Sequence, residues 1–201
     1  MTSVRNASAQ GRLSMAANPP ILLLDTNIWL DVYLPHRTGR EDALALLGEA
    51  RKRGASLAFA SQAALDVYWR VIVDNKRWIR QSEPLTEDAA RAIKRLAWDC
   101  VNEMQEIATA VPFDAGDFYQ CAKFRDLHDD LEDDVIMSAC VRSKANYLVT
   151  NDRKLLAHSP IDARTPRQMM GLFHAGLAKG TPTIDQQDTS YWLDRWLESY
   201  E

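Results

Sequence analysis

Two short apolar runs, each stopping at polar residues, constrain the fold of this chain more than any other feature. Residues 21–24 are followed by Asp25, and residues 147–150 are followed by Asn151 and Asp152. A short apolar run with polar boundaries is typical of a strand that is buried on both faces, as in a parallel sheet. The two runs are therefore expected to be strands inside one sheet.

Helical periodicity dominates the chain around these runs, and stop signals such as Pro35, Gly54 and Pro84 interrupt it. Further strands are expected at 56–60 and within 161–173. The expected helices lie at 27–34, 40–53, from Ser61 over about five turns, from Thr86 to about Thr109, from Asp114 to about Phe124, from about Asp133 to Val141, and within 161–173. Strands that alternate with helices predict an α/β domain with a mainly parallel sheet.

Apolar side chains at helical spacing, including those of the Trp and Met residues, are expected to face the core. In the helix that begins near Thr86 they are Ile93, Leu96, Ala97, Val101, Met104 and Ile107. Ser61 is the expected N-cap of the preceding helix, because its hydroxyl can accept a hydrogen bond from a free backbone amide.

The length of 201 residues fits one domain with an extension at each end. Residues 1–20 are polar and end in two prolines, which predicts a disordered tail. Residues 21–175 form the expected folded domain. Residues 176–201 form a polar extension that is expected to end in a short amphipathic helix.

Composition excludes several classes of protein. With 24 Lys and Arg against 28 Asp and Glu, the net charge is −4, which argues against a general polyanion binder. Three widely spaced cysteines argue against a disulfide scaffold or a structural zinc site, and they are expected to serve as apolar filler. No apolar run reaches the roughly 20 residues of a membrane helix, and the N-terminus has no apolar secretory segment. A soluble, cytoplasmic protein with no membrane partner is expected.

Asp25 and Asp152 would lie at one edge of the sheet if their strands are parallel neighbours. The carboxyl ends of strands are where open α/β sheets bind ligands. Two carboxylates about 4 Å apart repel by roughly 4 kcal/mol at an effective dielectric constant of 20, so the pair needs a proton or a cation. A divalent metal held by hard oxygen ligands is the simplest answer.

Two further acids are candidates for the same site. Asp66 lies within a predicted helix on the side of Tyr68 and Trp69, where an acid needs a partner, and Arg70 is an alternative partner at i+4. Asp133 begins an apolar helix whose free backbone amides favour a carboxylate, and Asp134 beside it could substitute. Asp129, Asp130 and Glu132 are weaker candidates, since a run of acids is more often a solvated loop.

Four segments carry a resemblance to the PIN-domain family of metal-dependent ribonucleases, which includes the VapC-type toxins. They are ILLLDTNIWLD at 21–31, ASQAALDVYW at 60–69, LEDDVIMSAC at 131–140 and YLVTND at 147–152. The resemblance spans roughly residues 21–173 and implies a three-layer α/β/α fold with a central sheet flanked by helices. It implies an acidic catalytic cluster of Asp25, Asp66, Asp133 and Asp152, with Asn27, Thr150 and Asn151 as accessory polar residues.

The resemblance also implies that the protein is an endoribonuclease. Its carboxylates, chiefly those of Asp25, Asp133 and Asp152, would hold Mg²⁺ or Mn²⁺. A metal-activated water would then attack an RNA phosphodiester. The protein would be the toxin of a type II toxin–antitoxin pair, with a cognate antitoxin as partner and a homodimer as the expected assembly. Arg153 and Lys154 directly follow Asp152 and could contact RNA phosphates, although an exposed helix face is the simpler interpretation.

Two alternatives stay open at this point. A phosphatase of the haloacid-dehalogenase type also uses an Asp after its first strand, but it needs a second acid two residues later, where this chain has Asn27. A PIN-like module that binds RNA or a protein partner without cleavage would carry the same sequence pattern.

Overall fold

The structure, a computed structural model, describes residues 19–125, 130–176 and 178. The order of its elements is β1 (Ile21–Leu24), α1 (Thr26–Tyr33), α2 (Arg40–Lys52), β2 (Ser56–Ala60), α3 (Ser61–Ile79), α4 (Glu87–Ile107), β3 (Thr109–Val111), α5 (Ala115–Phe124), α6 (Leu131–Ser143), β4 (Tyr147–Val149), α7 (Arg153–His158), β5 (Ala163–Arg164) and α8 (Pro166–His174). The predicted strands and helices are present with boundaries close to those expected.

The strands form one five-stranded sheet in the order β3-β2-β1-β4-β5, and each neighbouring pair is parallel. Strand β1 lies in the middle, and its residue Leu24 is paired in register with Val149 of β4. The condition under which Asp25 and Asp152 share one edge, that their strands are parallel neighbours, is thus met. Because they are parallel, the residues that follow them meet at the same edge of the sheet.

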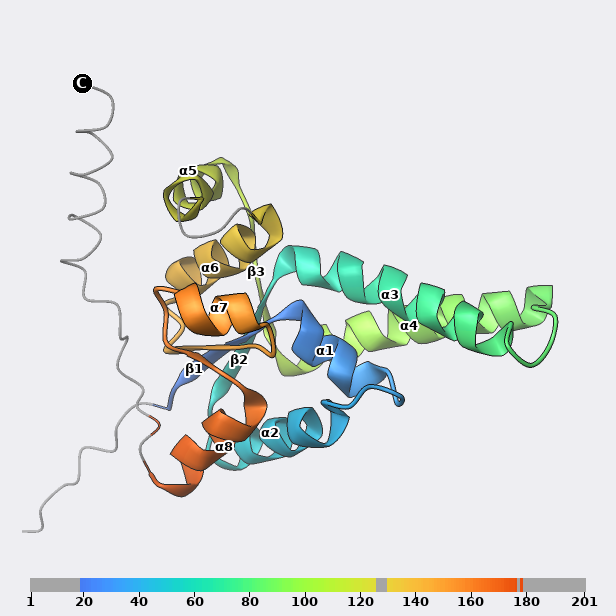
Figure 1. The fold of residues 1–201 in the computed structure, drawn as a ribbon, viewed down its shortest axis with the longest axis horizontal. Helices are drawn as coiled ribbons and strands as arrows, with labels where there is room; N and C mark the ends of the chain where they lie inside the picture. The colour runs from blue at the N-terminus through green and yellow to red at the C-terminus, as the bar shows by residue number, and fades with distance from the viewer. Residues whose placement is uncertain (1–18, 126–129, 177, 179–201) are drawn as a thin grey trace, which may run out of the picture.

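Helices cover both faces of the sheet, which confirms the three-layer α/β/α fold (Figure 1). Successive residues of β1 point to opposite sides. Leu22 and Leu24 belong to a core cluster that includes residues of α1, α2, α3, α4 and α8, whereas Leu23 belongs to a second cluster with α6 and α7. All three leucines are fully buried, as expected for a strand with helices on both faces.

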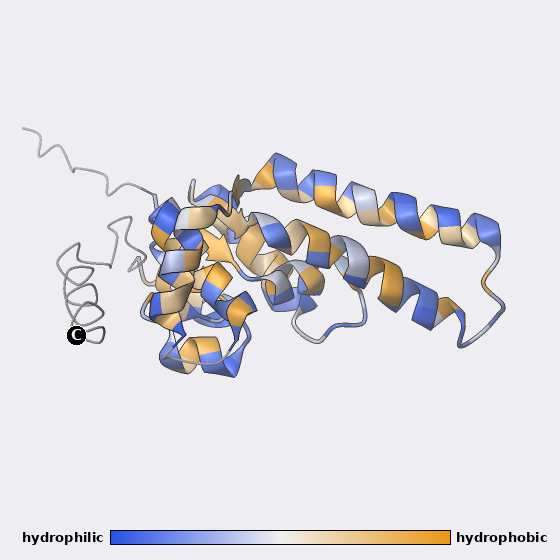
Figure 2. Cartoon of the chain, turned by 90° about the horizontal axis from the view of Figure 1, so that it is seen from above, coloured by the Kyte–Doolittle hydropathy of each residue, from blue (hydrophilic) through white to orange (hydrophobic). Residues whose placement is uncertain are grey.

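Helix α3 and helix α4 form a long hairpin that projects from the rest of the domain (Figures 1 and 2). Each helix buries one stripe against the other, and α3 also packs against α1, whereas the outward faces of the hairpin meet solvent. The expectation that the apolar helix residues lie in the core is therefore wrong for Trp69, Trp78 and Trp98, which are 55%, 63% and 57% exposed. It is also wrong for Leu96 and Ile107, whereas Ile93, Ala97, Val101 and Met104 are buried as predicted.

Helix caps follow the sequence signals with one exception. Thr86, Asp114 and Asp152 accept hydrogen bonds from backbone amides at the starts of α4, α5 and α7. Ser61 is not the N-cap of α3, because the extended residue before the helix is Ala60 and Ser61 is already helical.

A buried carboxylate joins α5 to α6. Asp117 accepts hydrogen bonds from Ser138 Oγ at 2.8 Å and from Arg142 Nε and Nη2 at 3.1 and 2.8 Å. Burial raises the pKa of Asp117, but the hydrogen bonds from Arg142, the Asp114 amide and Ser138 outweigh it and leave the pKa below its ordinary value. This network fixes the position of α6, the helix that carries Asp133.

Some expectations fall on parts of the chain outside the described residues. They are the tail up to residue 18 and the amphipathic helix at the C-terminus. Pro20 is described: it is buried, and its carbonyl accepts a hydrogen bond from the Ser56 amide at 2.9 Å. Within the described part of the chain, no helix combines the length and apolar character needed to cross a membrane.

Candidate functional site

Asp25 lies at the carboxyl end of the central strand and is only 5% exposed. Its backbone amide donates to the Val149 carbonyl at 3.0 Å, which ties it to β4. Its carboxylate caps α1 and accepts hydrogen bonds from the Thr150 hydroxyl at 2.6 Å and from the Asn27 side-chain amide. The carboxylate is thus held rigidly at the point where the two central strands end.

The predicted accessory residues form one hydrogen-bond network around Asp25. Thr150 Oγ1, besides donating to Asp25, accepts from Asn27 Nδ2 at 3.1 Å and from the Asp152 amide at 2.8 Å. The Asn151 amide donates to Asn27 Oδ1 at 3.1 Å. Asn27 therefore links the ends of β1 and β4, a role that fits its amide better than a second acid would.

The pKa of Asp25 is raised from 3.8 to about 6. Burial is the largest cause, because a carboxylate loses its hydration inside the protein. Hydrogen bonds from Thr150 and Asn27 partly offset the shift, and the negative charges of Asp133 and Glu132 add to it. Two acids of α6 therefore act electrostatically on the buried carboxylate of β1.

Asp66 and Glu132 extend this acidic cluster to α3. The pKa of each is raised, chiefly by burial, and the Arg70 charge works in the opposite direction at both. Asp66 and Asp130 also raise the pKa of Glu132. The structure thus couples Asp66 to Glu132, and Glu132 in turn to Asp25.

Glu132, a weaker candidate in the sequence, is exposed, but its negative charge contributes to the raised pKa of Asp25. Asp133 precedes Ile136 and Cys140 of α6 by three and seven residues. Glu132 precedes the same two residues by four and eight, which is the same helical face, and both Ile136 and Cys140 are buried. Helical spacing alone therefore does not separate the two acids. Asp134 lies on the side of α6 that is next to α5. Its negative charge there adds to the effect of burial in raising the pKa of Cys121.

Asp152 lies at the same edge of the sheet, and one of its oxygens is engaged in capping. Asp152 Oδ1 accepts from the amides of Lys154 and Leu155 at 2.6 and 3.2 Å, and so begins α7. Arg153 and Lys154 are exposed in the first turn of that helix. Their cationic side chains are therefore accessible near the acidic edge.

The donor set fits a divalent cation. Carboxylate oxygens are the ligands that Mg²⁺ prefers, and Mg²⁺ sites often use only one or two carboxylates together with waters and substrate phosphates. No group of three His, Cys, Asp or Glu side chains within residues 19–125, 130–176 and 178 forms a ready-made metal cage. Burial and the negative charges of Asp133 and Glu132 raise the pKa of Asp25, and a cation bound beside this carboxylate would lower it.

A second buried carboxylate, Asp31, supports the loop that follows β4. It accepts hydrogen bonds from Arg37 Nε at 2.5 Å and from Asn151 Nδ2 at 2.8 Å. A Cβ atom at Gly39 would lie 2.1 Å from Asp31 Oδ2 and 3.2 Å from Asn151 Nδ2. Close packing around Gly39 therefore holds Asp31 and Asn151 in place.

Gly39→Ala is expected to destabilise the protein by roughly 1–2 kcal/mol, because the added methyl group must displace the Asp31 carboxylate. Gly48→Ala in α2 is the matched control: a Cβ there meets nothing within 4 Å, and alanine favours helix by up to about 1 kcal/mol. Urea unfolding of both variants measures the difference. Equal free energies of unfolding in the two variants would show that Gly39 is not closely packed.

Fold and site together define an α/β protein with an acidic cluster at the carboxyl edge of a parallel sheet. The family model of the PIN domain matches residues 22–154, so the chain belongs to the PIN domain family. A comparison with curated proteins found no match. Among solved structures, the chain is similar to one in the crystal structure of VapBC2 from Rickettsia felis bound to a DNA fragment from their promoter. That likeness has 18% identity and a TM-score of 0.49, and it covers 72% of this chain and 98% of the other.

Proposed function

We propose that this chain is a Mg²⁺- or Mn²⁺-dependent endoribonuclease that hydrolyses RNA phosphodiester bonds. PIN domains are generally nucleases, which supports a hydrolase acting on nucleic acid. The observation that carries the proposal is the buried Asp25 carboxylate, whose pKa is raised to about 6 in part by the acids of α6. A group held ionised at such a cost is suited to binding a cation.

The residues of the site have distinct roles in this proposal. Asp25, Asp133 and Asp152 would hold the ion, and one oxygen of Asp152 is already engaged in capping α7. Asp66 and Glu132 add negative charge. A bound ion would supply an activated water and would neutralise charge on the scissile phosphate.

Polar and cationic neighbours complete the proposed site. Thr150 and Asn27 hold the Asp25 carboxylate in one orientation through their hydrogen bonds. Arg153 and Lys154 are placed to contact the RNA backbone, since cationic side chains bind phosphates beside such sites.

RNA cleavage with and without chelator tests the function. Purified protein is expected to cut a mixed RNA substrate in the presence of Mg²⁺ or Mn²⁺, and EDTA is expected to abolish cleavage until excess metal is restored. RNA binding without cleavage under either metal would support the non-catalytic module instead.

We further propose that the protein acts in the cytoplasm as the toxin of a type II toxin–antitoxin pair, as a homodimer that a cognate antitoxin inhibits. Expression of the chain alone is then expected to arrest growth of a bacterial host. Co-expression of the neighbouring reading frame should relieve the arrest. Normal growth with an RNA-cleaving protein would argue against the toxin role and leave the nuclease intact.

A further inference from the structure

One largely exposed face of α3 leads from the acidic site to the tip of the hairpin. Each residue lies three or four positions from at least one other member of the set, and only Lys76 and Arg77 are adjacent, so the set covers one broad side of the helix. They are Asp66, Trp69, Val73, Lys76, Arg77 and Arg80, and we call this set the α3 outer face. Trp69 and Val73 are 55% and 53% exposed. The face spans 14 residues, or about 21 Å at roughly 1.5 Å per residue.

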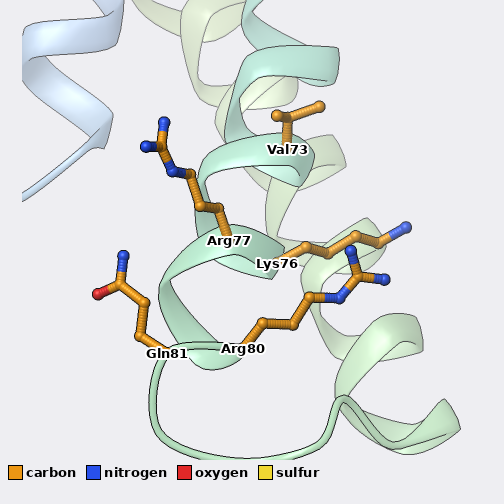
Figure 3. A pocket seen from close by; sticks show the side chains of 5 residues that line it. All are labelled: Val73, Lys76, Arg77, Arg80 and Gln81. Atoms are coloured by element: carbon orange, nitrogen blue, oxygen red, sulfur yellow. The ribbon is translucent and has the colours of Figure 1, made fainter.

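The far end of this face is cationic. Lys76, Arg77 and Arg80, together with Val73 and Gln81, line a hollow of about 410 Å³ near the tip of the hairpin (Figure 3). Figure 3 shows Lys76 and Arg80 extending to one side of the helix and Arg77 extending to the other. No ion pair among the described residues involves any of the three cations. In a chain of net charge −4, this is a local concentration of unneutralised positive charge.

The part of the face next to Asp66 is aromatic. Trp69 contacts Tyr68 with ring centroids 5.3 Å apart, and Tyr68 contacts Trp98 of α4 at 5.4 Å. Trp69 and Trp98 are both more than half exposed. Exposed apolar patches often mark binding sites, because hydration of a large apolar side chain is unfavourable. Flat aromatic rings are also the surfaces on which unpaired bases stack.

We propose that the α3 outer face binds single-stranded RNA and leads it to the acidic site. Its bases stack on Trp69, and its phosphates contact Lys76, Arg77 and Arg80. Surfaces that bind single-stranded nucleic acid without sequence preference combine cationic side chains with exposed aromatic rings. The length of the face corresponds to roughly six stacked nucleotides at about 3.4 Å each. The proposal rests on the proposed function for the identity of the nucleic acid.

Binding of a ten-nucleotide RNA by the full chain tests the proposal, with Asp25→Asn in all variants to prevent cleavage. The triple variant Lys76→Ala, Arg77→Ala, Arg80→Ala is expected to raise Kd at least tenfold. It should also reduce the slope of log K against log salt by about 2, since each lost phosphate contact contributes about 0.7. Trp69→Ala is expected to raise Kd by about tenfold with an unchanged salt slope.

The matched control removes three exposed cations elsewhere, by Arg51→Ala, Lys52→Ala and Arg167→Ala on α2 and α8. It is expected to change Kd less than twofold. Equal Kd values and salt slopes for the two triple variants, with equal melting temperatures, would overturn the proposal. So would a shift from dimer to monomer in sedimentation with unchanged RNA affinity, because the face would then bind a second copy of this chain.

Cleavage of substrates of different length separates this proposal from the proposed function. With Asp25 intact, the hairpin triple variant should cleave a dinucleotide as fast as the unmodified chain but show a raised KM for the ten-nucleotide RNA. If the unmodified chain cleaves neither substrate and the triple variant still loses RNA affinity, the nuclease function is wrong and the binding surface stands.

Discussion

Asp25→Asn is expected to lower the rate of RNA cleavage by about 100- to 1,000-fold while the fold is retained. The substitution removes the negative charge at the centre of the acidic cluster, and electrostatic groups of this kind are worth roughly that factor in active sites. Asparagine can keep an oxygen facing Thr150 and Asn27, and it is itself a good N-cap for α1. The loss is therefore attributable to the charge.

Asp99→Asn is the matched control, because it makes the same chemical change at an exposed position of α4. Its cleavage rate is expected to equal that of the unmodified chain within a factor of two. Initial rates with a labelled RNA at saturating Mg²⁺ measure both variants. Full activity in Asp25→Asn would remove Asp25 from the catalytic site.

The same substitution is expected to stabilise the metal-free protein at neutral pH. The pKa of Asp25 is about 6 in the folded protein, against an ordinary value of 3.8 for a solvated aspartate. Each unit corresponds to about 1.4 kcal/mol, so the ionised carboxylate costs the folded state on the order of 3 kcal/mol above pH 6. Asparagine carries no such cost.

The sign of the pH dependence follows from the direction of the shift. Below about pH 4 the carboxyl group is protonated in both the folded and the unfolded chain, so it contributes no penalty. Between about pH 4 and pH 6 the folded state binds more protons, and the stability of the unmodified protein falls relative to Asp25→Asn as pH rises. Above pH 6 the difference is constant.

Urea unfolding in EDTA at pH 4, 5, 6 and 7 measures this difference. Subtracting the curve of Asp25→Asn from that of the unmodified chain removes the contributions of the other titrating groups. A difference that stays flat from pH 4 to pH 7 would mean that Asp25 is not held at a raised pKa in the folded protein.

The sequence was sufficient to predict the sheet and the point where its central strands converge. Residues 21–24 and 147–149 are apolar without interruption, and all of them except the half-buried Ile21 are buried, as expected for strands with helices on both faces. Their parallel pairing then places Asp25 beside Thr150, as the hydrogen bond between them shows. Local patterns determine these features, so they could be predicted without coordinates.

The hairpin could not be predicted in the same way. Trp69, Trp78 and Trp98 have the spacing of core residues, but the spacing does not say whether a third layer exists to cover them. Helix α3 and helix α4 project beyond the sheet, so each has only one neighbour along much of its length (Figure 1). The capping role of Asp152 Oδ1 and the coupling of Glu132 to Asp25 likewise depend on side-chain positions that the sequence leaves open.

Calorimetric titration of metal-free protein with Mg²⁺ or Mn²⁺ at pH 7 tests the central claim most directly, because that claim concerns a cation site built around Asp25. The unmodified chain and Asp99→Asn are expected to bind the ion with the same affinity, and Asp25→Asn is expected to bind it at least tenfold more weakly. Equal affinity in all three proteins, or no saturable binding in any of them, would contradict the account.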